Sequence, residues 1–232
     1  MSKKPTKISD IDKQWALNAR KDRKIKSKLE YHLIICEGTQ TEPNYFKALK
    51  EIITGKDQEK ISIKVIGKGR GTNNLLKEAI KEVEKSTNYI SNVWLIYDKD
   101  EFTDESFNEV VEQCKQLNKE NDVIYNPIWS NESIETWILL HFIKFDTKMG
   151  RKDCIKKINE NFAKNNLGKY QKNDIKIYDK LKPYQSEAIR NAKWLEKKYG
   201  ETILPSEMNP CTKVHKLVEL LNKYIDNWRG NY

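Results

Sequence analysis

Two stretches decide how this sequence folds: YHLIICEG at residues 31–38 and VWLIYDKDE at residues 93–101. Each begins as a run of apolar and aromatic residues, which is typical of a buried β-strand, and each then leads directly into acidic residues. Glu37 follows the first run, and Asp98 and Asp100 follow the second. We therefore expect two buried strands that each end in carboxylates.

The segments around these strands alternate between strand and helix patterns. Further strand patterns occupy residues 61–66 and 123–125, and helical patterns occupy residues 42–53, 72–86, 104–118 and 133–142. Strands separated by helices of this length indicate βα crossovers, so we predict an α/β fold with a mostly parallel sheet flanked by helices. Because ligands gather at the carboxyl ends of parallel strands, Glu37, Asp98 and Asp100 fall where a site is expected.

Beyond residue 145 the pattern becomes helical, with helices predicted near 151–165, 185–199 and 212–228. We predict three parts: a basic N-terminal arm at 1–30, an α/β domain at 31–145, and a basic helical C-terminal region at 146–232. With 232 residues and 38% hydrophobic residues, the chain is long enough for one packed core with a smaller appendage.

Composition also bears on location and partners. No apolar run approaches the roughly 18 residues of a membrane span, and the first residues lack an apolar leader, so we expect a cytoplasmic protein without a membrane partner. The net charge is +9, divided into +6 for residues 1–30, −5 for 31–150 and +8 for 151–232. An acidic centre between basic flanks favours metal binding beside a polyanion, although solvated lysine-rich helix faces would give the same balance.

The acidic residues point to divalent-metal chemistry. Asp98 and Asp100 lie two apart at a strand end, and two carboxylates on one side repel unless a cation or a proton lies between them. Oxygen ligands suit Mg²⁺ or Mn²⁺, which act on phosphates. Glu37 would complete the coordination or act as general base, and Glu101 is a weaker ligand candidate.

Secondary candidates surround these residues. Thr41 and Glu42 are able to contact a ligand, or to cap and stabilise the helix that they begin. Glu132 and Glu135 share a face of a helix's first turn, so both are candidates for the site. Helix capping is the alternative role of this segment. His141 lies in an apolar helix, where it is either a histidine of the core or a residue of the site.

Two basic residues are candidates for holding a substrate backbone, Arg70 and Lys172. Arg70 lies in the glycine-rich segment 67–71, which would cradle a phosphate or form a simple turn. The segment lacks the spacing of a P-loop.

Five motifs in order resemble the RloB family, and the resemblance covers most of the chain. They are EGTQTE with Tyr45 at residues 37–45, YDKD at 97–100, SNESIETWILLHF at 130–142, YQK at 170–172 and NPCTKVH at 209–215. In the third motif the family usually has proline and phenylalanine where this chain has Glu132 and Ile134. This departure bears on the backbone conformation of the loop more than on the role of the loop.

The resemblance implies a Toprim-like fold, related to catalytic modules of topoisomerases, primases and OLD-type nucleases. It implies Mg²⁺ held by Asp98 and Asp100 with Glu37, a role in phage defence and abortive infection, and an ABC-class ATPase as partner. The leading hypothesis is therefore a metal-dependent nuclease acting on nucleic acid. A non-catalytic nucleotide- or nucleic-acid-binding regulator of an ATPase, and an enzyme of nucleotidyl transfer, are the alternatives. DNA or RNA preference and homo-oligomer formation stay open.

Overall fold

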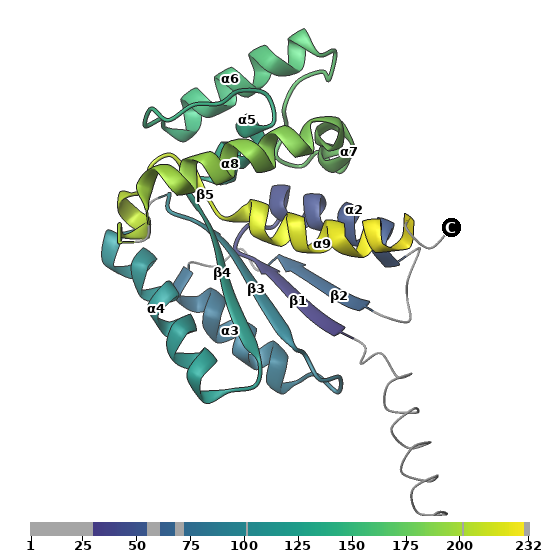
Figure 1. Cartoon of the computed structure of the whole chain (residues 1–232), viewed down its shortest axis with the longest axis vertical. Helices are drawn as coiled ribbons and strands as arrows, with labels where there is room; N and C mark the ends of the chain where they lie inside the picture. The colour runs from purple at the N-terminus through teal and green to yellow at the C-terminus, as the bar shows by residue number, and fades with distance from the viewer. Residues whose placement is uncertain (1–29, 55–60, 68–71, 101, 201, 230–232) are drawn as a thin grey trace, which may run out of the picture.

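The computed structural model describes residues 30–54, 61–67, 72–100, 102–200 and 202–229. The predicted N-terminal arm, apart from residue 30, lies outside this range, as do the candidates Arg70 and Glu101. The described residues form one sheet with helices on both faces (Figure 1). The predicted α/β class is confirmed.

The sheet has five strands in the order β2-β1-β3-β4-β5. The first four are parallel, and β5 pairs antiparallel with the end of β4. Their bounds are β1 Glu30–Cys36, β2 Ile61–Gly67, β3 Asn92–Asp98, β4 Ile124–Asn131 and β5 Cys211–Thr212. The central strands β1 and β3 are almost wholly buried, because helices cover both faces of the sheet.

The helices divide between the two faces. On one face α3 (Thr72–Glu84) and α4 (Asp104–Glu120) pack on one apolar cluster. A second cluster on the opposite face joins the remaining helices, which are α2 Thr41–Thr54, α5 Ile134–Leu140, α6 Arg151–Lys164, α7 Ile177–Leu181, α8 Gln185–Tyr199 and α9 Val214–Arg229. Figure 1 shows α6 and α7 at the top, away from α3 and α4. Among the described helices, none is both long and apolar enough to cross a bilayer.

The direction in which strands are added reverses at β1. The chain first places β2 on one side of β1, with α2 on one face, and then places β3 and β4 on the other side, with α3 and α4 on the opposite face. Neighbouring strands β1 and β3 are therefore followed by segments that leave toward opposite faces. Such a reversal opens a crevice at the carboxyl ends of the two strands.

Strand β4 is longer than predicted. The sequence pattern predicted a strand at 123–125, whereas β4 continues through Pro127 to Asn131. Pro127 pairs with Leu95 of β3 on one side, and on its other side no described strand is paired with it. An edge of this kind is where a sheet tolerates proline. The C-terminal region is mainly helical, as predicted, and it also contributes β5 to the sheet.

A buried histidine makes stability depend on pH. His141, at the end of α5, is 1% exposed, and its Nδ1 lies 2.9 Å from the carbonyl oxygen of Trp137. Burial lowers the pKa of His141 to about 4, so the folded protein keeps the ring neutral at pH values where the unfolded chain already binds a proton.

We predict that the free energy of unfolding falls as the pH drops from about 6.5 to 4, by up to about 3 kcal/mol from this group. His141→Asn keeps a donor for the Trp137 carbonyl oxygen and should remove that part of the slope. Urea unfolding of both proteins across this pH range measures it. An identical fall in the two proteins would contradict the assignment.

Candidate functional site

Glu37 directly follows β1 and contacts the segment that follows β3. Its backbone N–H donates to the carbonyl oxygen of Ile96 at 2.8 Å, and its Oε2 accepts the backbone N–H of Asp98 at 3.2 Å. Burial raises the pKa of Glu37 to about 7, against the opposing effect of the hydrogen bond from Asp98. Near neutral pH this carboxyl group therefore exists in both protonation states.

Gly38 allows a second acid to approach the backbone. A Cβ atom at position 38 would lie 2.5 Å from both carboxylate oxygens of Glu42, which is closer than real contacts allow. Glu42 begins α2 as predicted, yet its carboxylate is buried against Gly38. Burial raises the pKa of Glu42, and the nearby charge of Glu135 raises it further.

Asp98 and Asp100 meet the same cation. Oδ2 of Asp98 lies 3.1 Å from Nη2 of Arg151, and the carboxylate of Asp100 contacts Nη1. Asp100 adopts a positive φ of 31°, in the turn after β3 has ended. Oδ1 of Asp98 is buried and accepts no hydrogen bond from the described residues.

The pKa of Asp98 is raised well above its ordinary value. Burial is the main cause, since a carboxylate loses its hydration in the interior. The charges of Glu42 and Glu135 add to it, and Arg151 opposes it. Asp98 is thus in a place where negative charge is costly and a cation is favoured.

Arg151 is the centre of the site, and the sequence analysis did not select it. It begins α6, and its guanidinium contacts three carboxylates, those of Asp98, Asp100 and Glu135, with Nε 3.3 Å from Oε2 of Glu135. Burial lowers the pKa of Arg151, but these carboxylates raise it more strongly, so the side chain remains a cation. No motif marks a lone arginine at a helix start, and only the folded chain brings it to the strand ends.

Glu135 joins the third family-like motif to this centre. Its side chain is fully buried, and its Oε1 accepts a hydrogen bond from the hydroxyl of Tyr170 at 3.2 Å. Lys172 approaches the same oxygen at 4.0 Å, and its carbonyl oxygen accepts the hydroxyl of Thr41 at 2.9 Å. The segments that carry Thr41, Glu135 and Lys172 therefore meet at one place.

These residues line a pocket of about 210 Å³ at the carboxyl ends of β1 and β3. Its lining is Gly38, Thr39, Gln40, Thr41, Glu42, Asp98, Ile134, Glu135, Arg151 and Lys172. With Glu37 and Asp100 beside it, the described site contains five carboxyl groups and only two basic side chains. Acidic charge is in excess, which suits a site for a cation.

Two secondary candidates are not brought into this pocket. The carbonyl oxygen of Glu132 accepts the N–H of Asp100 at 3.0 Å, but Glu132 does not line the pocket. His141 packs edge-to-face on Trp137 inside the core, with ring centroids 4.8 Å apart. Thr41, Glu42, Glu135 and Lys172 do line it.

Among the described residues, no three acidic, histidine or cysteine side chains converge closely enough to ligate one metal ion. The guanidinium of Arg151 lies between the carboxylates of Asp98 and Asp100. The donor chemistry nevertheless fits Mg²⁺ or Mn²⁺, because all the acids offer oxygen and the buried Oδ1 of Asp98 has no partner. Asp98 and Asp100 would hold such an ion in the place that the Arg151 guanidinium occupies, and Glu37 lies at the neighbouring strand end.

Comparison with known proteins gives one match. A family model described as RloB-like protein matches residues 32–221, a range that includes every residue of the pocket. No curated protein and no solved structure matches the chain. Because the matched range spans most of the 232 residues, the chain belongs to the RloB-like protein family.

Proposed function

We propose that this protein is a metal-dependent nuclease that hydrolyses phosphodiester bonds of nucleic acid, and that it serves phage defence. The observation that supports the proposal is the placement of acids at the carboxyl ends of β1 and β3: the Glu37 carboxylate accepts the backbone N–H of Asp98, and Asp98 and Asp100 share the guanidinium of Arg151. Glu37 is distant in sequence from Asp98 and Asp100, yet all three lie at the carboxyl ends of neighbouring strands, and burial makes the negative charge of Asp98 costly unless a cation is near. Family membership supports the proposal without defining the reaction.

Each residue has a distinct task in this proposal. Asp98 and Asp100 would hold Mg²⁺ or Mn²⁺, which would supply charge stabilisation on the phosphate and a more acidic water. Glu37 completes the coordination or takes the proton of the attacking water. The water oxygen bonds to phosphorus, the bond from phosphorus to the leaving oxygen breaks, and that oxygen takes a proton from solvent.

Arg151 and Lys172 supply positive charge for the substrate. A guanidinium binds carboxylates and phosphates through the same planar set of N–H donors, so Arg151 is able to exchange its acidic partners for a phosphodiester. Lys172 is about half exposed at the pocket, where its ammonium group reaches the same region. Positive groups at this position would neutralise the phosphate during attack.

A second function is favoured by one observation. In the structure the guanidinium of Arg151 already contacts Asp98 and Asp100, so the chain itself supplies a cation at the place proposed for the metal ion. This supports a non-catalytic module that binds a nucleotide or nucleic acid and regulates a partner ATPase. Calorimetry with nucleotides and oligonucleotides separates the two functions, since binding without turnover favours the regulator.

The first prediction concerns Asp98. Asp98→Asn keeps the shape of the side chain but removes its charge, and we expect cleavage of DNA or RNA with Mg²⁺ or Mn²⁺ to fall by about 100-fold or more. Asp146→Asn, at a surface pair with Lys198, is the matched control and should cleave like the wild type. Equal cleavage by wild type and Asp98→Asn, or none by either with the cognate partner present, would refute the nuclease.

The second prediction concerns Arg151. Arg151→Gln leaves three carboxylates without their cation, and because the Arg151 side chain is only 27% exposed we expect a loss of about 2 kcal/mol in the free energy of unfolding without metal. Mg²⁺ or Mn²⁺ should then raise the Tm of the variant more than that of the wild type, since the ion no longer competes with the guanidinium.

The matched control is Arg190→Gln, which breaks an exposed pair with Glu187 on α8 and should change stability by less than about 0.5 kcal/mol. Thermal unfolding with and without the ion measures both variants. An equal metal-dependent rise in Tm for wild type and Arg151→Gln would show that Arg151 does not compete with the ion.

A further inference from the structure

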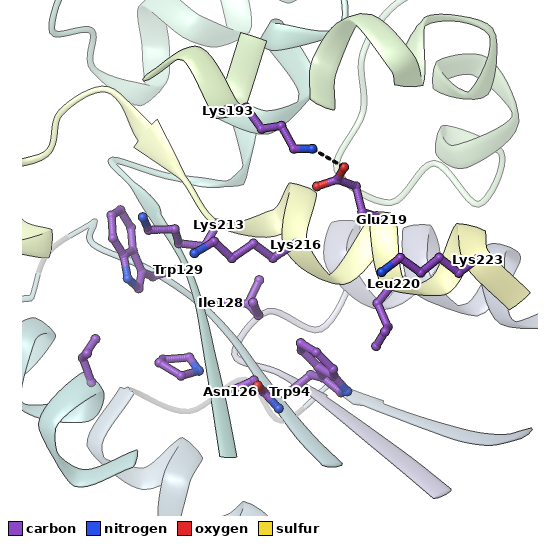
Figure 2. Close-up of a pocket in the computed structure, with 12 residues that line it drawn as sticks. Trp94, Asn126, Ile128, Trp129, Lys193, Lys213, Lys216, Glu219, Leu220 and Lys223 are labelled. Carbon is purple, nitrogen blue, oxygen red and sulfur yellow. Dashed lines mark hydrogen bonds and ion pairs between the residues drawn. The ribbon is translucent and has the colours of Figure 1, made fainter. Parts of the chain in front are cut away.

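A groove follows the open edge of β4 (Figure 2), and it shares no lining residue with the acidic pocket. The short strand β5 pairs only with Ser130 and Asn131. Residues 124–129 of β4 therefore have no strand partner on their outer side within the described chain. Pro127 offers no N–H in this stretch, so the edge is poorly suited to pairing with an added peptide strand.

Two adjoining hollows, of about 710 and 760 Å³, make up what we call the β4 groove. They share the lining residues Val111, Trp129, Lys193, Lys213 and Lys216. The groove lies between α4 on one side and α9 with the second half of α8 on the other, and Figure 2 shows the lysines along the α8–α9 side.

The floor of the groove is apolar and its margins are basic. Trp94, Ile128 and Leu220 contribute to the floor. The charged lining consists of Lys115, Lys193, Lys197, Lys213, Lys216 and Lys223 against Glu112, Glu196 and Glu219. Six ammonium groups and three carboxylates leave a net charge of +3, so the groove attracts anions.

The internal ion pairs do not cancel this charge. Lys213 and Lys216 share the single carboxylate of Glu196, at 2.6 and 2.7 Å. Lys193 pairs with Glu219, as the dashed line in Figure 2 marks. Lys223 is exposed on α9 and forms no ion pair with the described residues. Lys193, Lys216 and Lys223 are exposed, so they are able to bind a phosphate at little cost.

We propose that the β4 groove binds the sugar–phosphate backbone of the nucleic acid that the acidic pocket cleaves. The proposal rests on the nuclease function and assigns its substrate-holding surface. A backbone alternates anionic phosphates with less polar sugars, which matches basic margins beside an apolar floor. Trp94 and Trp129 are only 8% and 3% exposed, so the groove favours phosphate contacts over base stacking and binds without regard to sequence.

The position of the groove also suits the pocket. The groove floor runs along β4 toward Ser130, and Ser130 is the β-sheet partner of Asp98. A polyanion lying along the β4 edge therefore ends beside the strand that carries Asp98, at the point where β5 covers Ser130 and Asn131. The same strand would hold the substrate and border the reacting centre.

The test measures binding separately from cleavage. Fluorescence anisotropy of a labelled oligonucleotide, with EDTA present, compares the full chain with the triple variant Lys193→Gln, Lys216→Gln and Lys223→Gln. For a single strand we expect the slope of log affinity against log salt to fall by about 2, and affinity at moderate salt to fall by about tenfold or more. Single-stranded and duplex DNA and RNA are measured in parallel.

The matched control carries the same three charge changes on α6, at Lys156, Lys157 and Lys164, which are exposed and lie outside the groove. It should bind like the wild type. Should the groove variant fail to fold, Lys223→Glu alone is expected to lower the salt slope by about 1.

Several results would overturn the groove proposal: unchanged binding by the groove variants, an equal loss in the α6 control, or competition by polyglutamate as effective as by unlabelled oligonucleotide. Failure of the nuclease proposal is distinguishable from failure of the groove proposal. Groove-dependent binding without cleavage by the wild type would remove the nuclease and keep the groove as a binding surface. If the protein cleaves nucleic acid and the groove variants bind it as well as the wild type, only the groove proposal is refuted.

Discussion

The parallel pairing of β1 with β3 is the constraint on which the site depends. Their register runs from His32 opposite Asn92 to Cys36 opposite Ile96, and the N–H of Glu37 continues the ladder by one more bond to Ile96. Because the connections after the two strands leave toward opposite faces, nothing in the sheet itself fills the space beyond their ends. A slip in this register would separate Glu37 from Asp98.

Electrostatics then determines what occupies that space. A small buried volume contains three acids with raised pKa values, which are Glu37, Glu42 and Asp98. Arg151 is the cation there, and of these three it contacts only Asp98, together with two further carboxylates. Removing charges from water is costly, so a buried cluster persists only with close pairing. The guanidinium of Arg151 supplies positive charge to these acids in the structure, and the divalent ion of the proposed function would supply it at the same place.

Sequence patterns predicted the strand–helix alternation and the meeting of Glu37 with Asp98, because apolar runs and parallel topology are local or general properties. They predicted too short a β4, since Pro127 reads as a strand end unless the open edge is known. They missed Arg151, whose role arises from packing α6 over the strand ends. The metal and the reaction remain predictions, because residue types alone do not report coordination.

The close approach at Gly38 has a consequence for reading mutational data. Any side chain at position 38 would collide with the carboxylate of Glu42 and displace this carboxylate from its buried position. A substitution there would therefore report on the charge balance of the pocket, through Glu42, rather than on the turn that the glycine forms. Positions 38 and 42 are four residues apart in the sequence but in contact in space, so changes that compensate a substitution of Gly38 are expected first at Glu42.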